Sequence, residues 1–152
     1  ILLDFLVFFF ENYHNLFPML EIGQTYAHDF TFSQDEVNRF AEVTGDKNPV
    51  HTDAEFAAKT LFKVPIMHGM LGAALFSKVF GVLFPGEGTI YLSQTLNFLR
   101  PMFVDTNYEA IFTVKDVMKE KHRAIIETAI KDKTTGKICT TGDATVMNTE
   151  KI

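Results

Sequence analysis

Residues 70–84 restrict the fold of this chain more than any other stretch. A helix over these residues would be apolar on nearly every side, interrupted only by Ser77, Lys78 and several small residues, and Pro85-Gly86 would end it. A helix with this pattern is expected to be buried on most of its faces. At about 1.5 Å per residue it would be roughly 22 Å long, too short to span a bilayer but sufficient to cross a domain core.

Four segments with a two-residue period follow this helix. They lie at residues 90–98, 108–114, 123–131 and 137–147, and the last two flank a turn that contains Gly136. Alternating apolar and polar residues predict strands, and short hairpin-like connections predict antiparallel pairing. The simplest arrangement is an α+β fold in which a curved antiparallel sheet wraps around the long, central apolar helix.

The region before the long helix predicts a strand and a helix. Residues 23–32 alternate between apolar and polar side chains, which is typical of a half-buried strand. Ser33 and Glu36 have the spacing of a capping box, and Gly45 is a helix stop signal. We therefore expect a helix over residues 33–44.

A second capping signature, Thr52 with Glu55, predicts a short helix directly afterwards. Residues 45–51 are then expected to be a connecting loop. Asp46 and His51 lie in this loop on either side of an Asn-Pro turn, which can direct both side chains at one point. Together they could hold a water molecule, remove its proton and return one. The alternative is that Asp46 caps a turn and His51 packs against its neighbours.

A possible second part of a site is His68-Gly69, directly before the long helix. The backbone N–H groups at a helix N-terminus can stabilise negative charge that develops on an oxygen atom. The alternative is that Gly69 lets the chain turn closely into the core and that His68 is a polar residue with satisfied hydrogen bonds. The dipeptide alone does not decide between these interpretations.

The composition excludes several classes of function. The 14 Lys and Arg residues against 19 Asp and Glu give a net charge of -5, so a nucleic-acid partner is not expected. Cys139 is the only cysteine, which rules out an internal disulfide and favours a reducing compartment, the cytoplasm or an organelle matrix. The five His residues are scattered in the sequence, so no metal site is predicted. A dinucleotide or phosphate-binding glycine motif is also missing.

Residues 1–18 differ from the rest of the chain. The first ten residues are apolar except for Asp4, yet they are too few to span a bilayer and lack the features of a secretory signal. We favour an N-terminal extension foreign to the domain, with a native docking helix and a membrane anchor as alternatives. The single folded domain is then expected over residues 19–152.

Residues 40–51, followed by Ala57, resemble the signature of the MaoC-like (R)-specific enoyl-CoA hydratases. The resemblance covers most of residues 19–147. It implies a hot-dog fold, consistent with the predicted element order, and commonly a homodimer with acyl-thioester sites near the subunit interface. It continues through residues 65–70, Ser77, Ile90-Tyr91 and residues 98–101.

The resemblance also implies roles for individual residues. Asp46 and His51 match the family's catalytic pair, which positions the water added across a trans-2-enoyl thioester, and Gly69 matches the backbone donor to the thioester carbonyl. Asn48 would shape the loop, and Ser77 matches a polar position that could form a hydrogen bond near the site. Neither a metal nor a redox cofactor is implied; the partner is an acyl-CoA or acyl-carrier-protein thioester.

Three other functions compete with an (R)-specific enoyl-CoA hydratase. A 3-hydroxyacyl-acyl-carrier-protein dehydratase of fatty-acid synthesis would use the same pair in the opposite net direction. A thioesterase on a similar fold commonly has a carboxylate on the long helix, and residues 70–84 contain none. The third alternative is a non-catalytic subunit that binds acyl thioesters, since one fold can serve many roles. The intact set of Asp46, His51 and Gly69 argues against it.

Overall fold

The computed structural model describes residues 19–152, and the proposed extension at residues 1–18 lies outside the described residues. Strands and helices follow one another in the predicted α+β order. The elements are β1 (Thr25–Phe30), α2 (Gln34–Thr44), α3 (Pro49–Thr52), α4 (Ala54–Lys59), α5 (Gly69–Lys78), the π-helix η1 (Val79–Leu83), β2 (Ile90–Gln94), β3 (Asn97–Phe98), β4 (Tyr108–Met118), the 3₁₀ helix η2 (Lys119–Lys121), β5 (Arg123–Asp132) and β6 (Ile138–Met147).

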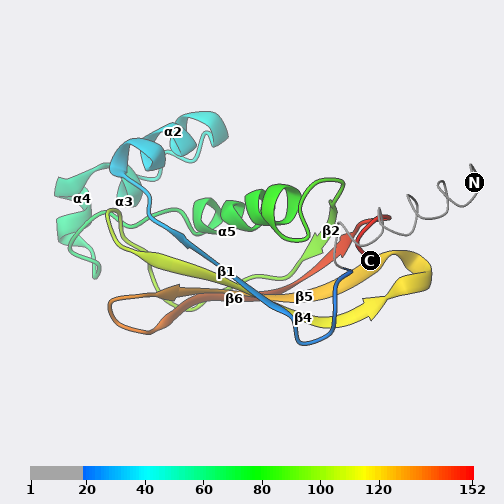
Figure 1. The fold of residues 1–152 in the computed structure, drawn as a ribbon. Helices are drawn as coiled ribbons and strands as arrows, with labels where there is room; N and C mark the ends of the chain where they lie inside the picture. Colours follow the sequence, from blue (N-terminus) through cyan, green and yellow to red (C-terminus); the bar gives the residue numbers. More distant parts are fainter. Residues whose placement is uncertain (1–18) are drawn as a thin grey trace, which may run out of the picture.

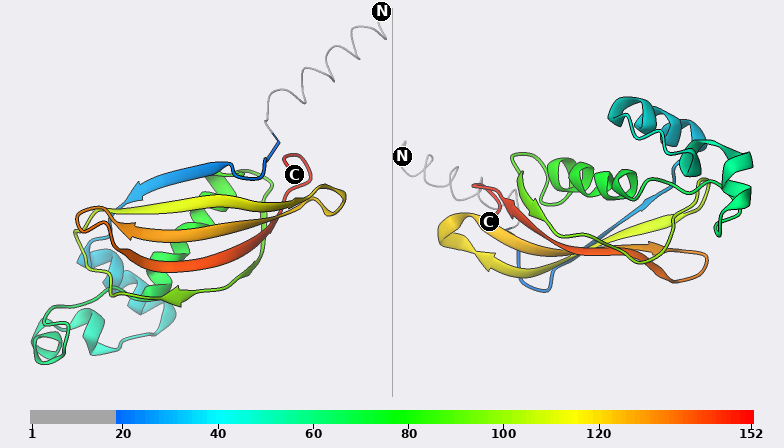
Figure 2. Two further views of the ribbon diagram at one scale, coloured as in Figure 1. Left: turned by 90° about the horizontal axis from the view of Figure 1, so that it is seen from below. Right: turned by 180° about the vertical axis from the view of Figure 1, so that it is seen from behind.

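The strands form one curved antiparallel sheet in the order β1-β4-β5-β6-β2, with β3 also paired to β6 (Figures 1 and 2). β4, β5 and β6 are joined by hairpins, as predicted. The expectation of a hairpin-like turn before β4 is wrong, because β2 and β3 pair with β6 while β4 pairs with β1. Residues 99–107 therefore cross from one side of the sheet to the other. Alternation identifies a strand, but it does not identify the partner of that strand.

Helix α5 lies across one face of the sheet (Figure 1), and their contact forms the core. The ring of Phe112 meets those of Phe76 and Phe80 edge-on, at centroid distances of 5.6 and 5.2 Å. The predicted alternation of β4 is confirmed residue by residue. Its buried side chains are Tyr108, Ala110, Phe112 and Val114.

The long apolar helix differs from its prediction in two ways. It is α-helical only as far as Lys78 and continues as the π-helix η1. It is also buried on one side rather than on most faces, since Met70 and Val82 keep exposed fractions of 57% and 68%. The reason is that a single sheet covers only one side of a helix. In residues 19–152 none of the helices is long and apolar enough to cross a membrane.

Strand β2 leaves one edge of the sheet unpaired within the described chain and carries apolar side chains on its outer face. Ile90 and Leu92 are exposed, while Tyr91 points inward and packs on Phe80 at a centroid distance of 4.9 Å. This burial raises the pKa of Tyr91 to about 12. The chain thus presents an apolar surface along an edge strand, which is unfavourable in isolation.

The ends of the first helix are as predicted. Ser33 and Glu36 form the reciprocal capping box of α2, and Gly45 ends the helix with a φ of 78°, in the left-handed region that glycine adopts without strain. The Ser33 backbone N–H donates to the Glu36 carboxylate and thereby lowers the pKa of Glu36.

The second cap is one residue later than predicted. Thr52 belongs to α3, and Asp53 caps α4 by accepting a 3.0 Å hydrogen bond from the Phe56 N–H. The expectation of an uninterrupted loop over residues 45–51 is also wrong. Pro49 starts the short helix α3, because proline at the first turn needs no backbone donor.

Candidate active site

Helices α2, α3 and α4 gather at one end of the sheet, next to the beginning of α5 (Figure 1). Two long-range hydrogen bonds hold this region together. Gln34 Nε2 donates to the His51 carbonyl over 2.9 Å, and the Ile66 N–H donates to the Val50 carbonyl over 3.2 Å. These bonds place α3 beside the segment that leads into α5.

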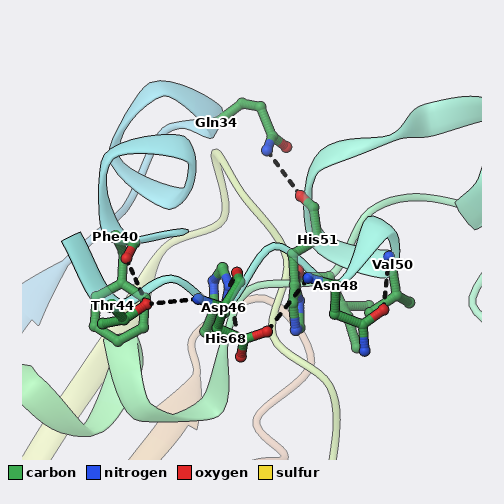
Figure 3. A network of polar contacts seen from close by, with 9 residues as sticks. Gln34, Phe40, Thr44, Asp46, Asn48, Val50, His51 and His68 are labelled. Carbon is green, nitrogen blue, oxygen red and sulfur yellow. Dashed lines mark hydrogen bonds and ion pairs between the residues drawn. The ribbon is translucent and has the colours of Figure 1, made fainter. Parts of the chain in front are cut away.

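Local hydrogen bonds shape the loop that carries Asp46 (Figure 3). The Asp46 N–H donates to Thr44 Oγ1, and the Asn48 N–H donates to Asp46 Oδ1, each over 3.3 Å. Asn48 in turn caps α3, because its side-chain oxygen accepts from the Val50 N–H. The Asp46 side chain remains 54% exposed. Asn48 is therefore occupied with loop geometry, and the Asp46 carboxylate is accessible.

His51 lies on α3 and is held in one tautomer. Its Nδ1 is 2.8 Å from the Ile66 carbonyl oxygen, and a carbonyl can only accept, so Nδ1 carries the proton. In the neutral ring Nε2 then presents a lone pair. An imidazole in this state can accept a proton from a bound water molecule.

His68 packs directly on His51. The two rings stack with centroids 3.8 Å apart and an interplanar angle of 30°, and the His68 side chain is only 2% exposed. His68 Nε2 lies 3.0 Å from the Asp46 carbonyl oxygen and 3.9 Å from Asp46 Oδ2. The His residues are scattered in the sequence, but the fold brings this pair together. Their separation of 17 residues matches no helix or strand period, so sequence reasoning had no signal for the contact.

Asp46, His51 and His68 place potential metal-ligand atoms within 4.8 Å of one another. The geometry nevertheless does not suit a shared ion. A metal lies in the plane of each imidazole that binds it, and stacked rings direct their lone pairs side by side rather than toward one point. In addition, one nitrogen of each ring is engaged by a backbone carbonyl. The arrangement suits a positioned water molecule better than a metal ion.

Gly69 is the first residue of α5 and lines a groove of about 420 Å³. The Leu71 and Gly72 N–H groups donate to the His68 carbonyl, whereas an α-helix supplies no acceptor for the N–H of its first residue. His51 lines the same groove, so both residues border one space. The other lining residues are Phe62, Ile66, Met67, Met70, Phe98, Leu99, Arg100, Pro101, Met102 and Thr140.

Ser77 is not brought to this groove. It lies in the last turn of α5, is exposed, and is absent from the groove lining. Eight residues of helix separate it from Gly69, a distance of about 12 Å. A role for Ser77 near the site thus remains a prediction. Asp46 is likewise absent from the groove lining, although its carboxylate lies within 4.8 Å of a ring nitrogen of His51, which does line the groove.

Comparisons with known proteins identify the family. The sequence matches the MaoC like domain over residues 19–138. It is 42% identical over 127 residues to an (R)-specific enoyl-CoA hydratase of Aeromonas caviae, covering 84% of this chain and 94% of that protein. It is also 37% identical over 136 residues to a 3-hydroxybutyryl-CoA dehydratase of Methylorubrum extorquens, covering 90% of this chain and 81% of that protein.

The solved structure of the (R)-hydratase from A. caviae superposes with a TM-score of 0.81 at 41% identity, covering 85% of this chain and 97% of that one. Similarity of this extent in both sequence and structure confirms the expected hot-dog arrangement. This chain belongs to the MaoC-like domain family.

Proposed function

We propose that this protein is a hydro-lyase that interconverts trans-2-enoyl-CoA and (R)-3-hydroxyacyl-CoA. The observation that carries the proposal is the shared groove, which His51 and Gly69 line from two different elements. The activities named for the two relatives above are of this kind. The mostly apolar lining suits an acyl chain.

Hydration begins with a water molecule held between Asp46 and His51. His51 Nε2 accepts a proton from the water, since Nδ1 is already protonated and donates to the Ile66 carbonyl. The Asp46 carboxylate accepts a second hydrogen bond from the same water and fixes its orientation. The water oxygen then forms a bond to C3 of the enoyl thioester.

Bond formation at C3 moves electron density onto the thioester oxygen. The N–H of Gly69 donates to this oxygen, and the N-terminal end of α5 adds its positive potential. The resulting enolate takes up a proton at C2, delivered from the pair that removed it from water. Water is thereby added across the double bond with no change of oxidation state in the protein.

The direct test compares the wild type with Asp46→Asn and His51→Ala. General acid–base groups typically contribute about 10²–10⁴-fold, so each variant should lower kcat by about that factor with a milder change in KM. The double variant should be far from additive, because both groups act on one water molecule. Circular dichroism and the melting temperature check that the variants fold. Wild-type turnover in folded Asp46→Asn would refute this chemistry.

The same assay decides the carrier. Enoyl-CoA and enoyl-acyl-carrier-protein substrates of equal chain length are compared by kcat/KM, with chiral analysis of the hydrated product. Preference for CoA and an (R) product support the proposal. A strong preference for the acyl-carrier protein favours the dehydratase of fatty-acid synthesis, and binding without turnover favours a non-catalytic subunit.

We also propose that the protein works as a homodimer joined along β2. The exposed apolar side chains of Ile90 and Leu92 line the open edge of the sheet, and a second copy would cover both the edge and these side chains. Leu92→Lys should shift the mass measured by analytical ultracentrifugation from dimer to monomer. An unchanged mass would place any interface elsewhere.

A further inference from the structure

We propose that His68 is a positioning residue, which fixes the Asp46 loop relative to the start of α5. The inference rests on the proposed function, since it concerns the geometry between the water-holding pair and the Gly69 donor. His68 itself is buried behind His51 rather than in the groove lining. It would therefore act on the substrate only through Asp46 and His51.

His68 is bonded to both halves of the site. Its backbone belongs to the helix that carries Gly69, because its carbonyl accepts from the Leu71 N–H over 3.0 Å and from the Gly72 N–H over 3.3 Å. Its side chain reaches the loop, where Nε2 donates to the Asp46 carbonyl over 3.0 Å (Figure 3). One residue thus sets the separation between the carboxylate and the first turn of α5.

The position of Asp46 depends on the hydrogen bond from His68 more than the position of His51 does. Among the hydrogen bonds of residues 19–152, the one from His68 joins Asp46 to a partner distant in the sequence, whereas the others link it to Thr44 at the end of α2 and to Asn48 in the loop. His51 is held separately, through the Ile66 carbonyl and through Gln34. Removal of the His68 donor should consequently loosen Asp46 first.

The second ring nitrogen argues that stability alone does not explain a histidine at position 68. Nδ1 is buried and has no hydrogen-bond partner among the described residues. A buried polar atom without a partner is unfavourable, and an apolar ring of similar size would avoid it. Since Asp46 lies at the surface, its carbonyl could be hydrated in such a variant. His68→Phe should therefore fold with equal or higher stability, and its loss should appear in catalysis.

The experiment compares His68→Phe with His68→Gln in the enoyl-CoA hydration assay. Phe keeps a ring against His51 but removes the donor, whereas the amide nitrogen of Gln reaches about as far as Nε2. Because a misplacement of about 1 Å can reduce turnover about 10²-fold, we expect His68→Phe to lower kcat by about 10- to 100-fold with little change in KM. His68→Gln should recover most of that loss. His28→Phe, the same change on β1, is the matched control and should leave kcat unchanged.

A double variant and a substrate-free signal complete the test. Adding His68→Phe to Asp46→Asn should lower kcat no further, since the positioned group is already lost. The carbonyl ¹³C resonance of Asp46 should move in His68→Phe and stay near its wild-type position in His68→Gln. This signal needs no turnover, so it distinguishes failure of the positioning role from failure of the proposed function.

Three results would overturn the inference: wild-type kcat in His68→Phe, equal loss in the Gln and Phe variants, or an additive double variant. If His68→Phe does not fold, His68→Gln is compared with His68→Asn, whose amide is one bond too short to reach Asp46. Activity in His68→Gln together with a loss of activity in His68→Asn then supports the inference, and equal activity in the two variants refutes it.

Discussion

Gly69→Ala tests the proposed position of the thioester carbonyl. A Cβ atom at residue 69 would lie 2.8 Å from both Cδ1 and Cε1 of Phe98. Carbon atoms in contact prefer about 3.5–4.0 Å, so the methyl group or the ring has to move by about 0.7–1.2 Å. Phe98 is half exposed and can swing outward, hence the stability loss should stay near the lower end of overpacking effects, about 1 kcal/mol.

The loss of activity in Gly69→Ala should be much larger than the loss of stability. In the proposed mechanism the thioester oxygen approaches the Gly69 N–H beside the new methyl group, and a displacement of about 1 Å reduces turnover about 10²-fold. That factor corresponds to about 2.7 kcal/mol of transition-state stabilisation. The assay is the disappearance of enoyl-CoA absorbance under saturating substrate, together with urea unfolding of the same sample.

Two controls make this prediction refutable. Gly81→Ala adds a methyl group in η1, where a Cβ meets nothing within 4 Å. It should change neither kcat nor the free energy of unfolding. Gly69→Ala combined with Phe98→Ala removes the steric conflict but leaves the methyl group in place. If this double variant regains the kcat of Phe98→Ala alone, the effect passes through Phe98 and the carbonyl does not bind at Gly69.

Three further predictions concern the scaffold. Ser33→Ala removes the cap of α2 and should lower the free energy of unfolding by about 1 kcal/mol, seen as a lower melting temperature. Burial raises the pKa of the Cys139 thiol and so lowers the fraction of reactive thiolate. Iodoacetamide should therefore alkylate the folded protein much more slowly at pH 8 than the urea-unfolded protein. Equal rates of alkylation would contradict the burial of Cys139. Gly142→Ala would place a Cβ 1.7 Å from the Thr95 carbonyl oxygen and should lower the free energy of unfolding by about 3 kcal/mol or more, seen as a lower urea midpoint. A wild-type midpoint would mean that β6 and residue 95 separate easily.

The parts of the fold that depend on local chemistry could be predicted from the sequence. The capping box of Ser33 and Glu36 and the buried face of β4 depend on neighbours three or two residues apart, and both are observed. The cap at Asp53 could not be distinguished from one at Thr52, because either residue can accept from a backbone N–H. The sheet order was also inaccessible, since partner choice depends on contacts between distant segments.

The site was predicted in its components but not in its arrangement. Asp46, His51 and Gly69 stand in a recognisable pattern. The fold places His51 and Gly69 on one groove, with the Asp46 carboxylate within 4.8 Å of a His51 ring nitrogen. The stacking of His51 on His68 is a tertiary contact with no periodic spacing, so His68 was noted only as the neighbour of Gly69. The exposed faces of α5 and β2 also escaped prediction, because an apolar pattern does not tell whether the covering surface comes from the same chain.

The region that carries the proposed catalytic pair, Asp46 and His51, has a very small core of its own. Between residues 34 and 64, buried side chains are limited to Val37, Ala41 and Ala57, whereas β4 alone buries four. Regions with few buried contacts open at lower free energy than the strands of a core. Amide hydrogens in α2, α3 and α4 should accordingly exchange through local unfolding while the sheet stays protected. Heat would then separate Asp46 and His51 from Gly69 before β4, β5 and β6 melt. Bound substrate favours the assembled site, so it would narrow the temperature interval between inactivation and global unfolding.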